Sequence, residues 1–145
     1  MIEIISFMAG QRPELVVLSG EIRQKVFVEE QKVDPALEYD EYESVARHFL
    51  LYTDGVPAAT ARWRETDKGI KLERFATLVM YRNQGLGAKL LQKVLEDVIP
   101  AGKKIYLHSQ LKAIPFYERH GFKKIGEQFT EANIEHFRME WKDGI

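Results

Sequence analysis

The residues best suited to chemistry begin with a glycine-rich segment, Arg82-Asn83-Gln84-Gly85-Leu86-Gly87. It separates an apolar, strand-like run at 72–79 from a run at 86–98 in which apolar residues recur at helical spacing. A glycine turn at the start of a helix presents backbone N–H groups without helical acceptors, and the helix dipole favours negative charge there. The segment therefore predicts a binding site for a phosphorylated cofactor.

Other phosphate-binding and hydrolytic templates fit the sequence poorly. A dinucleotide-binding turn needs a third glycine, where this chain has Leu90, and the segment lies in mid-chain after several antiparallel strands. A nucleoside-triphosphatase loop needs Gly-Lys-Ser/Thr, which does not follow here. Gly-x-Ser-x-Gly and His-Glu-x-x-His do not occur, so hydrolase templates find no support.

The bulk composition is that of an ordinary globular protein, and we expect a single domain, 1–145. Of the 145 residues, 45% are hydrophobic and 30% charged, and the net charge is −1. Such a chain has no global field to attract nucleic acid or a membrane, and it holds no apolar run of membrane-spanning length. Cysteine is absent, which excludes disulfides and a cysteine nucleophile. With no signal peptide visible, we expect a cytoplasmic protein.

Hydrophobic periodicity and turn signals predict the elements that must position the glycine-rich segment. The clearest helix is 86–98, because its apolar stripe is continuous and Pro100 follows its end. The order β-α-β-β-β-α-β-α-β-β is typical of an α+β fold, with a mostly antiparallel sheet of about seven strands and one parallel crossover near its middle. Strands are expected at 1–7, 45–53, 58–64, 70–79, 104–109, 122–129 and 134–141, further helices at 15–30 and 112–120, and a loop or short broken helix at 31–44.

Two motifs in this order resemble the GNAT N-acetyltransferase superfamily. Arg82-x-x-Gly85-x-Gly87 is similar to the acyl-CoA signature of that superfamily, Gln/Arg-x-x-Gly-x-Gly/Ala. The segment from Ala113 through Phe116-Tyr117 to Gly121-Phe122 is similar to its Ala-x-x-Phe-Tyr-x-x-x-Gly-Phe segment. The gap of about thirty residues between the motifs, filled by a helix and a strand, is also the spacing of the superfamily.

Residues outside these motifs resemble the small ElaA/YjcF-like branch of bacterial GNAT proteins. The resemblance therefore covers nearly the whole chain. The matching residues are Arg23-x-x-Val26-Phe27-Val28-x-Glu30-Gln31, then Glu38-x-Asp40, His48, Gln110 and His136.

The resemblance implies acetyl-CoA as co-substrate and assigns residues to its binding. The pyrophosphate is expected at the backbone N–H groups from Gln84 to Ala88, and the pantetheine arm beside a splayed strand whose N–H polarises the thioester carbonyl. The alternative from the residues alone is that the two glycines only make a tight turn. The expected CoA-binding residues are Phe75, Ala76, Thr77, Arg82, Asn83, Gln84, Gly85, Leu86, Gly87, Ala88, Lys89 and Phe116.

Two residues are candidates for proton transfer. Tyr117 stands at the tyrosine position of the superfamily, where a phenol protonates the leaving thiolate; the alternative role is core packing, and the two are compatible. Glu73 is the candidate base for the attacking amine, since period two along its strand places Phe75 and Thr77 on the same face. An equally strong alternative is a glutamate paired with Arg74, Arg62 or Arg64.

The acceptor site is the part that the sequence defines least. The resemblance implies that the first helix and the following loop wall this site, which points to Phe27, Glu30 and Glu38. His108 is a further candidate for substrate binding, and it should lie near the cofactor, because its strand should diverge from the strand of Phe75. The acidic segment containing Glu38 predicts either a carboxylate-rich wall for a cationic amine or a solvated loop.

We therefore predict an enzyme that moves acetyl from acetyl-CoA directly to a primary amine of a small molecule or peptide. The alternative is a non-catalytic acyl-CoA-binding sensor or regulatory module, and a longer acyl group is a second enzymatic possibility. The histidines lack metal-ligand spacing, so no metal is expected. We expect no nucleic-acid or membrane partner, and a homodimer is possible for this superfamily.

Overall fold

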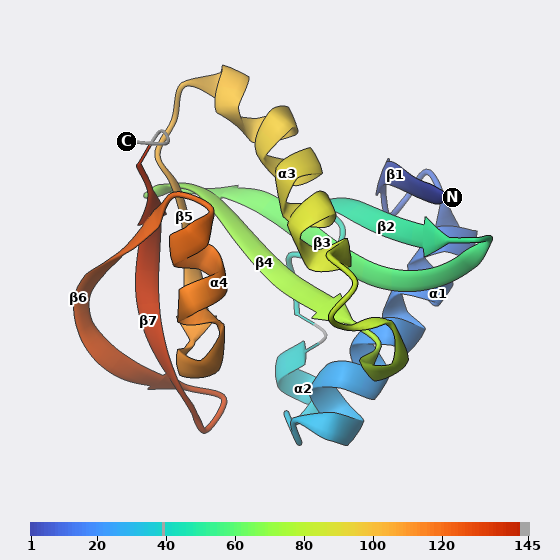
Figure 1. Ribbon diagram of the computed structural model, residues 1–145, viewed down its shortest axis with the longest axis horizontal. Helices are drawn as coiled ribbons and strands as arrows, with labels where there is room; N and C mark the ends of the chain where they lie inside the picture. The colour runs from blue at the N-terminus through green and yellow to red at the C-terminus, as the bar shows by residue number, and fades with distance from the viewer. Residues whose placement is uncertain (39, 143–145) are drawn as a thin grey trace.

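The described residues, 1–38 and 40–142 of a computed structural model, form one seven-stranded sheet with helices on both faces (Figure 1). The strand order is β1-β2-β3-β4-β5-β7-β6. Among the described strands only β4 and β5 pair in parallel. The predicted α+β class and single parallel crossover are therefore confirmed. The strands are β1 (Ile2–Met8), β2 (Arg47–Thr53), β3 (Val56–Thr66), β4 (Gly69–Thr77), β5 (Ile105–Gln110), β6 (Phe122–Glu131) and β7 (Ile134–Trp141).

The first helix changes type partway along its length. The sequence predicts one helix over 15–30, whereas α1 (Pro13–Arg23) passes directly into a π-helical segment, η1 (Gln24–Glu30). No helix in the described part of the chain is long and apolar enough to cross a membrane. The remaining helices are α2 (Pro35–Glu38), α3 (Leu86–Val98) and α4 (Ile114–Arg119), with short 3-10 turns η2 (Val79–Tyr81), η3 (Ile99–Ala101) and η4 (Leu111–Ala113).

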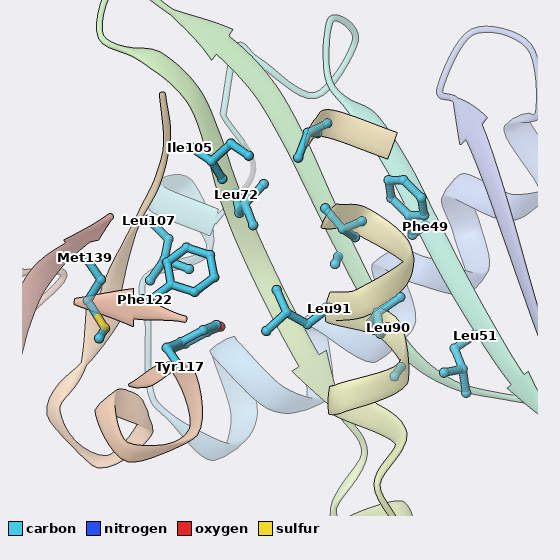
Figure 2. Packing of buried hydrophobic residues seen from close by; sticks show 14 of the residues in the cluster. Phe49, Leu51, Leu72, Leu90, Leu91, Ile105, Leu107, Tyr117, Phe122 and Met139 are labelled. Atoms are coloured by element: carbon cyan, nitrogen blue, oxygen red, sulfur yellow. The ribbon is translucent and has the colours of Figure 1, made fainter. Parts of the chain in front are cut away.

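An apolar core lies on each face of the sheet, and successive side chains of β2 alternate between the two cores. Phe49 and Leu51 belong to the core formed with α3 and α4, whereas Leu50 between them belongs to the core formed with α1. Figure 2 shows the first core, in which Leu91 of α3 and Tyr117 of α4 point inward with Leu51 and Phe49. Burying a large apolar side chain contributes about 1.5–3 kcal/mol. Apolar packing therefore holds helices on both sides of the sheet.

The parallel strands β4 and β5 pair over only part of their length. The last register pair is Leu72 with Leu107. Beyond it, the residues at 73–77 of β4 and 108–110 of β5 are not paired with each other in the described structure. The expected divergence of the His108 strand from the Phe75 strand is therefore confirmed, and it opens the middle of the sheet.

A β-bulge at the start of this opening changes which side chains share a face. On β3, Thr60 pairs with Ala76 and Arg62 with Glu73, so two residues of β4 oppose one of β3. Arg74, in the bulge, has a φ of 58°. The bulge adds one residue to the alternation of β4.

The expectation that Glu73, Phe75 and Thr77 share one face is consequently wrong for the first two. Phe75 packs into the core that contains Leu72 and Tyr117. Glu73, next to Leu72 in the regular part of the strand, points to the opposite face and meets cationic side chains there. The cause is the extra residue of the bulge, which simple period-two counting ignores.

Candidate functional site

The opening between β4 and β5 is a cleft of about 430 Å³. It reaches from α4 on one face of the sheet to η1, α2 and the β6–β7 turn on the other. Ligand sites commonly form where neighbouring strands separate in this way. Six of the residues that the sequence marks as candidates line the cleft together: Phe27, Glu38, Glu73, Phe75, His108 and Tyr117.

The glycine-rich segment lies at the start of α3. Asn83 and Gly85 both have left-handed backbones, with φ of 64° and 76°, so the segment turns sharply into the helix. No side chain caps the N-terminus of α3, and its first turn contains no acidic residue. The first N–H groups of the helix, those of Leu86, Gly87 and Ala88, therefore have no helical acceptor and can bind an anion.

Phe116 of α4 connects this helix start to the second motif. A Cβ atom added at Gly87 would lie 3.7 Å from Cζ of the Phe116 ring, which is ordinary van der Waals contact. Phe116 also packs edge-on against Tyr117, with ring centroids 5.1 Å apart. The predicted cofactor residues of α3 and α4 are thus neighbours in space.

Arg82 lies beside the helix start but is already engaged by a carboxylate. Its guanidinium forms two hydrogen bonds of 2.7 Å to the Glu30 carboxylate, and its Nε donates to the Thr77 carbonyl at 2.9 Å. Glu30 therefore ties η1 to the end of β4. It does not line the cleft; it borders a shallower hollow next to it, together with Gln31 and Gln110.

Tyr117 combines a packed ring with a free hydroxyl group. The ring meets Phe75, Phe116 and Phe122 edge-on, and Figure 2 shows the hydroxyl pointing away from α4 toward β4. This hydroxyl makes no hydrogen bond within the described residues. Burial raises the pKa of Tyr117, so the phenol is neutral and able to donate a proton.

Glu73 is held in a dense group of cations. Its carboxylate lies 2.9 Å from Arg62, 3.0 Å from Arg64 and 3.1 Å from Lys71. Burial alone would raise the pKa of Glu73, but these cations, with Arg62 foremost, lower it below its usual value. The ion-paired alternative for Glu73 is therefore observed for Arg62 and Arg64.

His108 lies on the other side of the cleft, and among the described residues it has a single carboxylate partner. Its Nδ1 is 3.1 Å from the Glu131 carboxylate, at the end of β6. The ring is held edge-on against Phe129 and tilted against Tyr106, with centroids 5.0 Å and 6.0 Å away. The hydrogen bond from His108 lowers the pKa of Glu131 to about 2, against the opposing effect of partial burial.

Comparison with known proteins connects this arrangement to a family. A sequence profile of the acetyltransferase (GNAT) domain matches residues 14–143. The uncharacterized N-acetyltransferase YjcF of Bacillus subtilis is 36% identical over 121 residues, which cover 81% of this chain and 86% of YjcF. The chain belongs to the GNAT acetyltransferase family.

Solved structures of GNAT proteins support the assignment to the ElaA/YjcF-like branch. Escherichia coli ElaA superposes with a TM-score of 0.86 and 26% identity, over 98% of this chain and all (100%) of that one. An acyl-CoA N-acyltransferase from Pseudomonas aeruginosa superposes with a TM-score of 0.85, also at 26% identity, over 98% of this chain and 100% of the other. The predicted family, fold and enzyme class are therefore confirmed.

The carboxylates that line this GNAT cleft are accompanied by cations. Cations lining the cleft match the anions: Arg64, Lys71, Arg74 and Lys112 face Glu38, Asp40, Glu73 and Glu131. Glu38, only 2% exposed, lies 2.5 Å from Arg23. Sequence alone could not show this neutralisation, because Arg23 is 15 residues from Glu38 along the chain.

Several lining residues were not predicted from the sequence as part of the site. Gln31 accepts a hydrogen bond of 2.8 Å from Gln110, which joins η1 to β5 across the cleft. Glu131 precedes a hairpin turn at the end of β6 and meets His108 of β5 across β7, which lies between these two strands in the sheet. That strand order is not encoded in any local pattern. Within the described residues, no group of three or more His, Cys, Asp or Glu side chains is arranged to hold a metal ion.

Proposed function

We propose that this GNAT protein transfers an acetyl group from acetyl-CoA directly to a primary amine of a small molecule or peptide. The observation that carries the proposal is the cleft at the point where β4 and β5 separate. It has the free hydroxyl of Tyr117 on one face, and the uncapped start of α3 lies beside α4. A thioester and an amine can therefore approach each other from opposite faces of the sheet.

The residues present fit a diphosphate and an extended pantetheine arm. The N–H groups at the start of α3 suit phosphate oxygens, and Lys89 in the same turn adds a positive charge. The backbone at 75–77, unpaired toward β5, suits the amides of the pantetheine and supplies an N–H for the thioester carbonyl oxygen. Gly87 and Phe116 then border the path of the cofactor between the diphosphate site at the start of α3 and the pantetheine site at 75–77.

Tyr117 is the proposed acid for the leaving thiolate. Its burial keeps the phenol protonated, and its hydroxyl has no competing partner among the described residues. The sequence contains no cysteine and no serine in a nucleophile motif, so the amine attacks the thioester without an acyl-enzyme. Glu73 remains the sequence-based prediction for the base, although its carboxylate already neutralises several cations.

The competing function is a CoA-binding sensor without turnover. It would use the same helix start and cleft but release no free CoA. Thiol release from acetyl-CoA, measured against a broad library of primary amines, separates the two functions. We expect release that depends on an amine; acyl-CoA binding without release over the whole library would favour the sensor. Longer acyl-CoA donors in the same assay determine the acyl preference.

A matched pair of glycine variants tests the cofactor site independently of turnover. Gly85 and Gly102 both have left-handed backbones, with φ of 76° and 68°, and neither has an atom within 4 Å of an added Cβ. Gly85→Val and Gly102→Val should therefore cost similar stability, of about 1–2 kcal/mol. Only Gly85→Val should abolish CoA binding in calorimetry. Equal CoA affinity in the two variants would contradict the position of the phosphate site.

Two further parts of the proposal concern the location of the protein in the cell and its oligomeric state. A cytoplasmic location is supported by the absence of cysteine from the sequence. A homodimer is proposed by analogy with other GNAT proteins. Sedimentation of the purified protein over a range of concentrations tests whether it forms this homodimer.

A further inference from the structure

Glu73 of β4 and His108 of β5 occupy equivalent places, where the two strands separate and the cleft begins. Leu72 and Leu107 are the last paired residues of β4 and β5 and both belong to the core under α3 and α4. The next residues, Glu73 and His108, therefore point to the opposite face of the sheet. Both line the cleft, on the side away from Tyr117. Either is placed to meet an amine that enters from that face.

The hydrogen bond of His108 defines which ring nitrogen carries a proton. Nδ1 lies 3.1 Å from Oε1 of Glu131. Glu131 is ionised, and a carboxylate only accepts hydrogen bonds, so Nδ1 must donate. In the neutral ring, Nε2 then carries the basic lone pair. Within the described residues, Nε2 has no hydrogen-bond partner.

Glu73 offers a much poorer base than His108. Three cations within 3.1 Å stabilise its ionised form, and taking up a proton would neutralise the carboxylate that all three contact. An imidazole is the side chain whose ordinary pKa lies nearest to neutral pH, and a neighbouring carboxylate both orients it and stabilises its protonated form.

We propose that His108 is the base that deprotonates the acceptor ammonium, and that Glu131 is its positioning residue. This inference rests on the proposed amine acetylation. Nε2 of His108 takes one proton from R–NH₃⁺, and the freed lone pair forms the C–N bond at the thioester carbonyl carbon. The C–S bond breaks; Tyr117 gives its hydroxyl proton to the sulfur and regains one from the nitrogen. His108 then releases its proton to solvent, and the products are the amide and CoA thiol.

The charges around His108 come from three neighbouring strands. On β6, Glu131 is its direct partner, and on β7, His136 lies 3.9 Å from the same carboxylate. Arg138 of β7 is opposite His108 in the sheet but stacks its guanidinium over Tyr106. From β4, Lys71 acts on Glu131 and is itself paired with Glu73. Glu131 is therefore the anion in direct contact with His108.

The experiment is the pH dependence of kcat/KM for amine acetylation by the intact protein and its variants. His108→Gln should lower kcat/KM about a hundredfold at neutral pH and remove the acid limb of the profile. The deficit should narrow as the pH approaches about 10.4, where a lysine-like amine loses its proton unaided. Free imidazole should partly restore His108→Ala, which a merely structural role would not permit.

Variants on the β6–β7 hairpin separate positioning from general charge effects. Glu131→Gln removes the carboxylate that accepts from Nδ1 and orients the ring, so kcat/KM should fall, but by less than in His108→Gln. The matched control is Glu135→Gln, which removes an exposed carboxylate that bonds Gln128 and Thr130 outside the cleft. Its profile should match the wild type.

Each outcome decides a distinct question. A wild-type profile in His108→Gln, with turnover retained, overturns the inference and leaves the proposed function intact. Loss of the acid limb in Glu73→Gln, but not in His108→Gln, also overturns it. If the wild-type protein acetylates no amine at any pH, the proposed function fails and this inference fails with it. Circular dichroism melting of each variant excludes unfolding as the cause of lost activity.

Discussion

Carboxylates on the two sides of the cleft differ in how many charged side chains they contact and in how exposed they are. On the β4 side, Glu73 is 7% exposed and belongs to a group of arginines and carboxylates that links β3 and β4 to the segment around α2. On the β5 side, the carboxylate of Glu131 is 46% exposed and its direct partner is His108. The two carboxylates therefore differ in the number of their charged partners more than in residue type, and the proposed catalytic role belongs to the pair with fewer partners.

The largest effect on stability should come from the centre of the β4 side. Arg62 is fully buried and lies 2.6 Å from Asp40, 2.9 Å from Glu43 and 2.9 Å from Glu73. Arg62→Met leaves these carboxylates without their shared cation, and we expect a loss of about 3–5 kcal/mol in the free energy of unfolding by urea.

The matched variant for Arg62→Met lies on the β5 side. Arg138 of β7 stacks over Tyr106 at 4.5 Å and bonds Glu140 at 3.2 Å. Arg138→Met should cost only about 1 kcal/mol, because its contacts are few and partly exposed. Similar losses in the two variants would break the contrast between the two sides of the cleft.

The next effect should appear in turnover and spare stability. Tyr117→Phe keeps the ring contacts with Phe75, Phe116 and Phe122 and removes only the hydroxyl. We expect kcat to fall about a hundredfold or more, with CoA affinity nearly unchanged, because general acid catalysis is lost.

A second tyrosine provides the control for hydroxyl removal. Tyr106 bonds Thr66 at 2.7 Å and does not line the cleft. Tyr106→Phe should leave kcat unchanged. Unchanged turnover in Tyr117→Phe would refute the acid role of that residue.

The elements that the sequence predicted well are those specified by local patterns. The helix over 86–98 and the strand over 134–141 begin and end where periodicity and turn residues place them. Local glycine, phenylalanine and tyrosine motifs likewise identified the start of α3 and Tyr117. Spacing along one segment is enough for such features.

The features that the sequence could not predict depend on pairing between distant segments. The bulge at Arg74 is defined by the pairing of β4 with β3, and because of it Phe75 lies on the face opposite Glu73. Arg62 meets Asp40 across 22 positions of sequence, and His108 meets Glu131 across 23. Strand order and register create these contacts, so a single sequence predicts the residue types without their partners.

Acid should weaken the β4 side through its carboxylates. Opposite charges hold the folded-state pKa of Glu73, Asp40 and Glu43 below their ordinary values, in spite of burial. A lowered folded pKa gives stability that is present above the unfolded pKa and is lost as the pH falls through the folded pKa. The free energy of unfolding should therefore decrease as the pH falls below about 4.5.

Glu73→Gln tests how much of that dependence belongs to one carboxylate. The variant should lose about 1–3 kcal/mol at pH 7, since three cations lose their shared anion, and its acid dependence should be shallower. Glu96→Gln, on the exposed face of α3, should retain the wild-type dependence. A wild-type slope in Glu73→Gln would show that this carboxylate does not couple folding to protons.

The smallest effect should come from the exposed pair that joins η1 to the glycine-rich segment. Arg82 and Glu30 form a two-bonded ion pair, but their side chains are 33% and 40% exposed, so water and salt screen the attraction. A double-mutant cycle of Arg82→Gln and Glu30→Gln should give a coupling energy of about 0.3–1 kcal/mol, which decreases in 1 M salt as expected for an exposed pair. A coupling as large as the loss in Arg62→Met would show that exposure does not separate the two kinds of pair.

The same variants test whether Arg82 also contacts the cofactor. If it does, Arg82→Gln should weaken CoA binding, whereas Glu30→Gln, which frees the guanidinium, should not.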